Sequence, residues 1–262
     1  MAEWDPVTYG RFADERGRPF ADLLSRVGAE RPATVVDLGC GSGALTATLA
    51  RRWPGADVLG LDSSPAMVSA AAAHAGERVR FAVADLRVWR PERPVDVLVS
   101  NAALQWVPGH RDLLPAWVRS LRPGGWLAFQ VPGNFDAPSH RLLAELADRP
   151  PYADLTAGRE RPASADPGAY LSDLTALGCR VDAWESTYLH VLTGEDAVFR
   201  WISGTGARPV LQSLPEDLRT DFEREYRARL RRAYPSRPYG TVLPFRRVFV
   251  VAQARPRDPS TG

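Results

Sequence analysis

Residues 34–43 read Thr-Val-Val-Asp-Leu-Gly-Cys-Gly-Ser-Gly, and this stretch decides the fold. Its first five residues form a short apolar run with several β-branched side chains, which is typical of a buried strand. The glycines that follow let the backbone turn tightly and approach a ligand, because they carry no Cβ. Leu45, Leu49 and Trp53 then recur at helical spacing until Pro54 ends the pattern. The segment therefore predicts a strand, a glycine-rich turn and a helix.

The same alternation of strand and helix continues along the chain. Further apolar runs predict strands over 58–61, 79–83, 95–100, 126–131, 180–188 and 247–253. Helical patterns are found over 6–29, 113–121, 195–203 and 216–234, and another helix opens at Ser64 and Pro65. The strands within 34–131 are apolar on both faces, which is typical of parallel strands joined by right-handed helical crossovers. We therefore predict a doubly wound α/β fold with a mostly parallel, seven-stranded sheet.

The length of 262 residues suits one domain, and 45% hydrophobic residues can fill its core. Only Leu142, Leu143 and Leu146 give a short helical stretch in the segment that follows the fifth strand. We divide the single domain, 1–262, into five parts: an N-terminal helical segment (1–30), a cofactor-binding core (33–132), a helical insertion (133–178), C-terminal strands and helices (179–254) and a flexible tail (255–262).

All 33 basic residues are arginine, and they are scattered rather than gathered into a tract. With a formal net charge of +2, this pattern does not indicate a nucleic-acid partner. The absence of lysine excludes Schiff-base enzymes, Walker-A phosphate loops and lysine-dependent kinases, because their chemistry requires an amine.

The two cysteines, Cys40 and Cys179, do not have the spacing of metal ligands, so we expect no metal and a reducing compartment. The first residues lack the basic start and apolar run of a signal peptide, and no stretch approaches the roughly 20 apolar residues of a membrane span. We therefore predict a cytoplasmic protein with no membrane partner, and the sequence leaves the oligomeric state open.

Polar side chains follow four successive predicted strands. Asp37 ends the first strand, where its carboxylate could hold the ammonium group of an amino acid. Asp62 ends the second strand and could accept hydrogen bonds from both hydroxyls of a ribose. Asp85, after the third strand, could accept the exocyclic amine of adenine while the Leu86 amide meets a ring nitrogen. Asn101 follows the fourth strand. Because the carboxyl ends of parallel strands meet at one edge, these residues predict a site for an adenosyl cofactor.

Each of these residues also has a plainer interpretation. The aspartates and Asn101 could form helix caps or ordinary turns, and Met67 could fill the core rather than contact adenine. The candidate cofactor residues are Asp37, Gly39, Cys40, Gly41, Gly43, Asp62, Ser63, Met67, Asp85, Leu86, Asn101 and Ala102.

The glycine loop alone does not separate two cofactor classes. Gly39, Gly41 and Ala44 also satisfy the dinucleotide pattern G-x-G-x-x-[G/A], so an NAD-dependent dehydrogenase or a non-catalytic dinucleotide-binding module stays as an alternative. Asp37 argues against it, because its negative charge would repel a pyrophosphate.

This arrangement resembles the class I S-adenosylmethionine-dependent methyltransferases over residues 34–131. Within that class the chain is similar to the trans-aconitate 2-methyltransferase family, through motifs that run from its beginning to its C-terminal third. These motifs include Trp4-Asp5-Pro6, Arg16-Gly17-Arg18-Pro19, Asn101-Ala102-Ala103-Leu104-Gln105-Trp106, Thr187-Tyr188-Leu189-His190, Arg208-Pro209 and Pro244-Phe245-Arg246-Arg247.

The resemblance implies methyl transfer from S-adenosylmethionine to a carboxylate of a small polycarboxylic acid, trans-aconitate first, giving its monomethyl ester. An ionised carboxylate can attack the activated methyl group without a general base, so we assign no catalytic residue. Arginine forks match the remaining carboxylates. The candidate acceptor residues are Tyr9, Arg16, Arg18, Trp106, Tyr188, His190, Trp201, Arg208, Arg246 and Arg247. Other polycarboxylates, and other small-molecule acceptors, stay open.

The N-terminal segment with Trp4, Tyr9 and Arg16 is predicted to fold over the cofactor as a lid that excludes water. Deletion of the first eighteen residues should therefore abolish turnover in a methyl-transfer assay. Normal acceptor kinetics in that truncated protein would rule out the lid.

Overall fold

The structure is a computed structural model that describes residues 13–158 and 161–256. It divides into two compact units. The first, here called the core unit, comprises Trp4–Pro132, Ser164–Ser186 and Arg247–Gly262. The second, here called the helical unit, comprises Met1–Glu3, Gly133–Ala163 and Thr187–Arg246.

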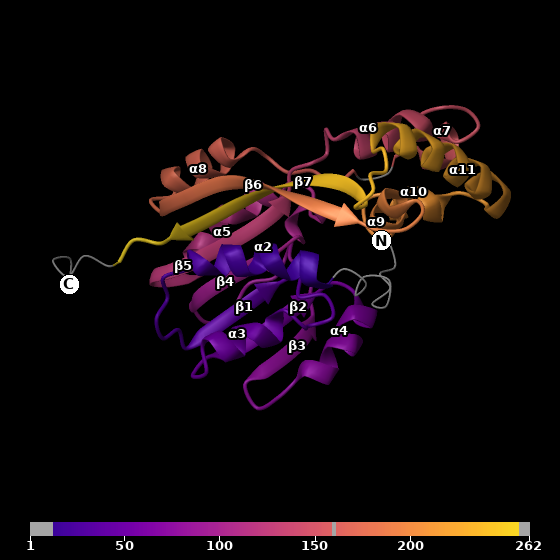
Figure 1. Ribbon diagram of the computed structural model, residues 1–262. Helices are drawn as coiled ribbons and strands as arrows, with labels where there is room; N and C mark the ends of the chain where they lie inside the picture. Colours follow the sequence, from indigo (N-terminus) through magenta and orange to yellow (C-terminus); the bar gives the residue numbers. More distant parts are fainter. Residues whose placement is uncertain (1–12, 159–160, 257–262) are drawn as a thin grey trace. The chain divides into compact units, whose positions relative to one another are not determined.

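Seven strands of the described residues form one sheet in the order β3-β2-β1-β4-β5-β7-β6 (Figure 1). Neighbours among β1 to β5 pair in parallel, and β7 is antiparallel to β5. The seven-stranded, mostly parallel sheet is therefore confirmed. The strands are β1 (Thr34–Leu38), β2 (Asp57–Asp62), β3 (Val79–Val83), β4 (Val95–Asn101), β5 (Leu121–Pro132), β6 (Arg180–Leu192) and β7 (Thr241–Gln253).

The strand order reverses between β1 and β4, because the chain runs from β1 outward to β3 and then returns to the other side of β1. Ligands of open α/β sheets bind beside such a switch point, outside the carboxyl ends of the strands. The apolar side chains of β1 and β4 are buried in the core: Val36, Leu38 and Leu98 are all at most 4% exposed. The switch point therefore stands on a rigid, fully packed sheet.

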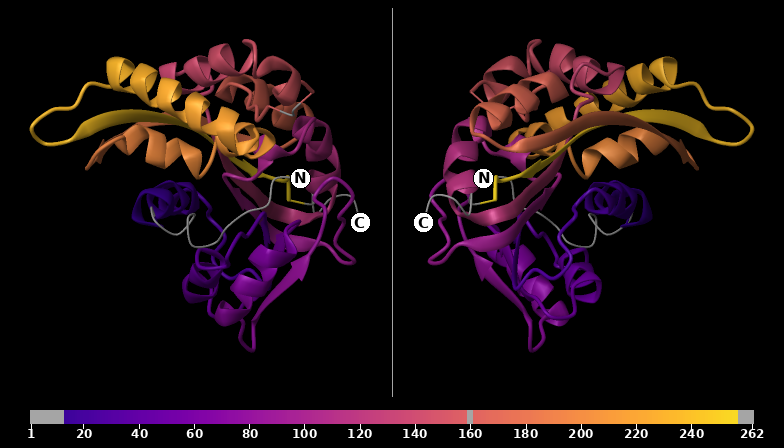
Figure 2. Two further views of the ribbon diagram at one scale, coloured as in Figure 1. Left: turned by 90° about the vertical axis from the view of Figure 1, so that its right-hand side faces the viewer. Right: turned by 90° about the vertical axis from the view of Figure 1, so that its left-hand side faces the viewer.

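Helices cover both faces of the sheet in the core unit, as expected for a doubly wound fold. Figures 1 and 2 show α2, α3 and α4 on one face and α5 and α8 on the other. The helices of this unit are α2 (Ala13–Ser25), α3 (Thr46–Arg52), α4 (Pro65–Ala71), α5 (Leu114–Arg119) and α8 (Pro167–Ala176), with short 3-10 turns η1 (Ala72–His74), η2 (Leu104–Trp106) and η3 (His110–Leu113). The N-terminal helix predicted over 6–29 is described only from Ala13 onward.

The fifth strand differs from the prediction at its beginning. It starts at Leu121 rather than at residue 126, so the preceding helix is shorter than predicted. Pro123 and the two glycines after it, a sequence also typical of a helix terminus, form an irregularity inside the strand. Gly124 has a φ of +79°, and the pairing with β4 shifts register between Val95 and Val97. A bulge, not a helix terminus, explains these glycines.

The described residues of the predicted insertion form three helices, where the sequence indicated one. They are α6 (Pro138–Ala147), α7 (Ala153–Thr156) and α8. The third belongs to the core unit, where Tyr170 and Leu174 are fully buried. The Tyr170 hydroxyl lies 2.7 Å from Nε2 of His110 and accepts a hydrogen bond from the Ala165 amide. The contact with His110 fixes α8 on the core unit, and the bond from Ala165 fixes the segment that leads into α8.

The helical unit is built on α6 and α11 (Glu216–Ala233), which pack against each other. The Tyr226 hydroxyl donates to the Ser139 carbonyl at 2.8 Å, and the Ser139 amide donates to the Tyr234 hydroxyl. The same unit holds α9 (Ala197–Ser203) and α10 (Arg208–Ser213), of which α10 was not predicted. Within the described residues, no helix is long and apolar enough to cross a membrane, and no cluster of three acidic, histidine or cysteine side chains could hold a metal ion.

Candidate functional site

Asp37, the last polar residue of β1, is buried at the switch point with 3% exposure. Its Oδ2 accepts a hydrogen bond of 2.6 Å from the Thr46 hydroxyl, whereas its buried Oδ1 has no hydrogen-bond partner in the described part of the chain. Burial raises the pKa of Asp37 to about 7, the hydrogen bond from Thr46 lowers it, and the charge of Asp62 raises it further. An orphaned carboxylate oxygen in this place fits a cationic ligand group.

The glycine loop after β1 requires its glycines. Gly39 has a φ of +84°, and a Cβ at this residue would lie 2.2 Å from the Cβ of Ala103. The amides of Gly39 and Cys40 both donate to the Leu61 carbonyl, which fastens the loop to β2. Gly41 also has a positive φ, but a Cβ there would meet no atom within 4 Å. The loop therefore packs tightly on one side and is open on the other.

Asp62, at the end of β2, organises the adjoining backbone. Its Oδ2 accepts from the Gly41 amide and its Oδ1 from the Ser64 amide, both at 2.9 Å. Ser64, not Ser63, caps α4 by accepting from the Met67 amide. The Met67 side chain is buried in the core unit, which agrees with the plainer interpretation of that residue. Asp62 thus stabilises the glycine loop directly.

Asp85 lies two residues past β3 and is engaged by Arg87. The Arg87 guanidinium donates to both carboxylate oxygens, and its amide donates to Oδ1. The side-chain hydrogen bond from Arg87 holds the pKa of Asp85 below its usual value. The ordinary turn that we considered as an alternative is therefore present. Leu86 is buried in the main hydrophobic cluster.

Asn101 ends β4 and Ala102 follows it, and both contact β5. Gln130 donates from Nε2 to Oδ1 of Asn101 at 2.5 Å, and its backbone carbonyl accepts from the Ala102 amide at 2.9 Å. Ala102 has a φ of +54°, which is rare for a residue with a Cβ. Asn101 does not cap the turn that follows, since the N-cap of η2 is Ala103. These contacts hold the loop against β5, and Ala103 in the same loop lies close to Gly39.

Cys40, inside the glycine loop, is a poor nucleophile. Burial, together with the charges of Asp37 and Asp62, raises the pKa of its thiol. Because only the thiolate attacks, covalent catalysis at this residue is disfavoured.

The structure brings the predicted cofactor residues to one edge of one unit. Asp62 and Asn101 are the last residues of β2 and β4, and Asp37 is the last residue but one of β1, which lies between them. Asp85 follows β3. The buried Oδ1 of Asp37 and the open side of the glycine loop fit the methionine and ribose parts of S-adenosylmethionine. The individual cofactor roles of these residues stay predictions.

The predicted acceptor residues are divided between the two units. In the core unit, Arg18 is exposed, Trp106 is half-buried, and Arg247 is 4% exposed and donates from Nη1 to Oε1 of Gln130 at 3.3 Å. Tyr9 and the side chain of Arg16 lie outside the described residues.

In the helical unit, the predicted acceptor aromatics form one stack. The His190 ring lies 4.7 Å from the Trp201 ring and 6.2 Å from the Tyr188 ring, measured between centroids. His190 and Trp201 are buried, whereas Tyr188 is half-buried. Arg208 and Arg246 are also half-buried, and Arg246 donates from Nη1 to the Gly133 carbonyl. The stacked rings could simply stabilise the helical unit, or they could line the site that binds the acceptor.

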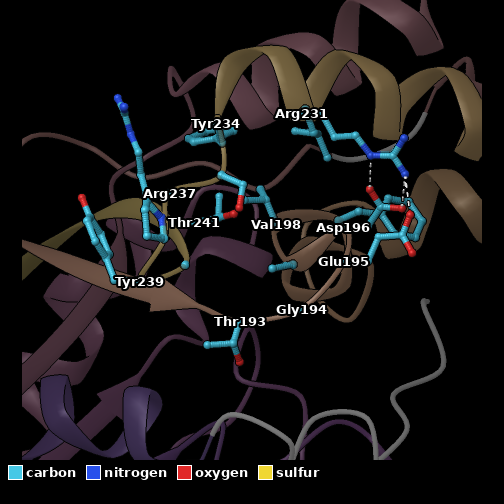
Figure 3. A pocket seen from close by; sticks show the side chains of 16 residues that line it. Thr193, Gly194, Glu195, Asp196, Val198, Arg231, Tyr234, Arg237, Tyr239 and Thr241 are labelled. Atoms are coloured by element: carbon cyan, nitrogen blue, oxygen red, sulfur yellow. Dashed lines mark hydrogen bonds and ion pairs between the residues drawn. The ribbon is translucent and has the colours of Figure 1, made fainter.

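A pocket of about 590 Å³ lies elsewhere in the helical unit, between the 193–199 and 230–241 segments (Figure 3). The predicted site residues do not line it. Arg231 points to Asp196 and Glu195, and its ion pairs with them measure 2.7 and 3.2 Å. This pocket therefore does not coincide with the predicted site.

Sequence reasoning missed two residues that support the site. Thr46 is fully buried and holds Asp37, and Gln130 is fully buried and contacts both Asn101 and Arg247. A glutamine inside the apolar run 127–131 is itself a signal, because a buried amide needs partners on both of its ends. The position of Thr46 gave no comparable signal.

Comparisons with known proteins agree with this fold. Residues 35–125, which cover β2 to β4 and β1 from its second residue, match the protein family described as "Methyltransferase domain". A solved structure of a putative methyltransferase, in complex with the Haloferax volcanii Trm112 methyltransferase activator, is similar with a TM-score of 0.60 and 21% identity; the match covers 96% of this chain and 94% of that one. The chain thus has the class I methyltransferase fold, with a methyltransferase domain over residues 35–125.

Two relatives narrow this class. The trans-aconitate 2-methyltransferase of Streptomyces avermitilis is 56% identical, over 96% of this chain and 97% of that protein. The enzyme of the same name from Mycobacterium tuberculosis is 50% identical, over 95% of this chain and 96% of that protein. The chain therefore belongs to the trans-aconitate 2-methyltransferase family. The predicted family, enzyme class and cofactor, S-adenosylmethionine, are confirmed, and the dehydrogenase alternative is rejected.

Proposed function

We propose that this enzyme transfers the methyl group of S-adenosylmethionine to a carboxylate of trans-aconitate, giving a monomethyl ester. The observation that carries the proposal is the identity of 50 to 56% to relatives of that name over nearly the whole chain. A buried arginine in the core unit, Arg247, supports an anionic acceptor, because a guanidinium fork matches a carboxylate.

The bound cofactor supplies a methyl group that is activated by its positive sulfur. The residues of the chain bind and orient it. Asp37 would hold the ammonium group through its buried carboxylate, and Asp62, which accepts from the Gly41 amide, would hold the ribose. For Asp85 to accept from adenine, its pair with Arg87 has to rearrange, since Arg87 occupies both carboxylate oxygens.

The acceptor needs positioning rather than activation. A carboxylate is ionised at neutral pH and has no proton to lose, so His190 is not needed as a general base. The chain's task is to hold the remaining negative charges so that one oxygen faces the methyl group. Arg247 is the strongest candidate for this task, because it is buried and the amide of Gln130 fixes one of its nitrogens.

The predicted cytoplasmic location stays a proposal, which the two widely separated, unpaired cysteines support.

We predict that Arg247→Ala raises the KM for trans-aconitate about 10- to 100-fold, the expected effect of losing a charge-assisted hydrogen bond. Arg247→Lys should recover only part of this loss, because an ammonium lacks the fork. The measurement is a methyl-transfer assay against a panel of polycarboxylates and neutral acceptors, with calorimetric titration of S-adenosylhomocysteine to verify the cofactor site.

The matched control is Arg122→Ala, which removes an exposed arginine paired with Asp96 at the far end of β5. Its KM should equal that of the wild type. If neutral acceptors react as fast as anionic ones, the enzyme acts on another small metabolite and the proposed acceptor is wrong.

A further inference from the structure

Gln130 occupies an unusual position on β5. It is fully buried between apolar neighbours, Phe129 and Val131. It pairs in register with Asn101 on β4, and Arg247 on β7 is its diagonal neighbour, since Phe249 is the residue directly opposite. Paired and diagonal residues lie on the same face of a sheet. Asn101, Gln130 and Arg247 therefore form a row across three strands.

Gln130 accepts a hydrogen bond from one neighbour in this row and donates one to the other. Its Nε2 donates to Oδ1 of Asn101 at 2.5 Å, and its Oε1 accepts from Nη1 of Arg247 at 3.3 Å. Its backbone carbonyl also accepts from the Ala102 amide. A rotated amide would turn a donor toward the arginine and an acceptor toward the Asn101 oxygen, so the network allows one orientation only. Both ends of the Gln130 side-chain amide therefore have a hydrogen-bond partner.

We infer that Gln130 is a positioning residue that fixes the direction of the Arg247 guanidinium and couples acceptor binding to the loop at Asn101 and Ala102. The inference rests on the proposed function, which assigns Arg247 to the acceptor. The N–H donors of a guanidinium lie in one plane, so fixing Nη1 sets the direction of the others. The same amide holds the loop that the sequence assigns to the cofactor.

The chemistry of this row explains why an amide suits position 130. A carboxylate there would accept from Arg247 but would also neutralise its charge, and an acceptor carboxylate would then be bound more weakly. An apolar side chain would remove the hydrogen bonds to both neighbours in a buried place, which is costly for polar groups. A glutamine orients Arg247 without neutralising its positive charge.

The test compares Gln130→Met, Arg247→Ala and the double variant with the wild type, by KM and kcat for trans-aconitate. Methionine has a similar volume, so the packing of β5 is retained. We expect Gln130→Met to raise KM about tenfold with a smaller effect on kcat, and to weaken S-adenosylhomocysteine binding about threefold. Because Gln130 acts through Arg247, the double variant should have the KM of Arg247→Ala alone.

Gln130→Glu provides a second variant in case methionine prevents folding. It keeps an acceptor for Arg247 but loses the donor to Asn101, so we expect a folded protein with a lower unfolding temperature and a raised KM. The matched control is Gln253→Met, which removes a β7 glutamine bonded to the Gly124 carbonyl and to Arg180. Its KM should not change.

Two failures are distinguishable. If the wild type forms no methyl ester of trans-aconitate, the proposed function is wrong. If the wild type is active but Gln130→Met has an unchanged KM, or adds its full effect to that of Arg247→Ala, the positioning role is overturned. An unchanged affinity for S-adenosylhomocysteine would overturn the coupling to the Asn101 loop, whatever the acceptor is.

Discussion

Replacement of Gly39 by alanine is expected to weaken S-adenosylhomocysteine binding about 100-fold or more, because a displacement of the loop by about 1 Å has effects of that size. The added Cβ would lie 2.2 Å from the Cβ of Ala103, and the residue keeps a φ of +84°. The left-handed backbone and the overpacking together should lower the free energy of unfolding by about 3 kcal/mol. Calorimetric titration and denaturant unfolding measure the two effects.

Gly124→Ala separates the backbone contribution from the steric one. Gly124 has a similar φ of +79°, but a Cβ there would meet no atom within 4 Å. This variant should lose only about 1 kcal/mol and bind the cofactor normally. If Gly39→Ala behaves like Gly124→Ala, the contact with Ala103 does not hold the loop and the close approach is not required.

The cofactor edge could be predicted because its information is local. Each of Asp37, Asp62 and Asn101 stands directly at the end of a strand that its own apolar run identifies. Parallel topology then brings such strand ends to one edge without any knowledge of side-chain positions. The order of residues along the chain was therefore enough to bring these residues to one edge of the sheet, although it did not show the orphaned oxygen of Asp37.

Contacts between strands could not be predicted in the same way. Gln130 contacts Asn101 and Arg247 across 29 and 117 residues of sequence. These contacts depend on the register of three strands, and a register cannot be read from one strand alone. The bulge at Gly124 shows the same limit, because its proline and glycines are equally typical of a helix terminus.

The arginines show how burial depends on packing. Arg18 and Arg247 were equal candidates for the acceptor, but Arg18 lies on the surface of α2 and Arg247 is buried on β7. The apolar run that follows Arg247, residues 248–252, indicated a buried strand, yet an arginine at the start of such a strand is as easily exposed. The antiparallel pairing of Arg247 with Pro132 beside Gln130 accounts for its burial.

The raised pKa of Asp37 predicts that stability and cofactor binding change in opposite directions with pH. The pKa of Asp37 is about 7 in the folded chain, whereas the pKa of an exposed aspartate is 3.8. Between these two values the unfolded chain has released the proton and the folded chain keeps it. The contribution of Asp37 to stability is therefore fully present below pH 4, is lost as the pH rises to 7, and stays constant above pH 7. The free energy of unfolding falls by about 4 kcal/mol over this range, because a pKa difference of one unit corresponds to roughly 1.4 kcal/mol.

Asp37→Asn has no carboxylate to ionise, so this part of the pH dependence should disappear. Denaturant unfolding of the protein without cofactor should show a variant that exceeds the wild type in stability at pH 8 by several kcal/mol and approaches it at pH 4.5. Other acidic groups titrate in both proteins and cancel in the difference. Asp57→Asn, an exposed aspartate at the start of β2, serves as the control.

Cofactor binding should change in the other direction, because the ammonium group of the ligand requires the ionised form of Asp37. The affinity of the wild type for S-adenosylhomocysteine is expected to rise as the pH rises through 7. At pH 8 the Asp37→Asn variant should bind about 10- to 100-fold more weakly, and its affinity should lose this dependence on pH. A variant that binds as well as the wild type at pH 8 would show that Oδ1 of Asp37 faces no cationic group, and its burial would then need another explanation.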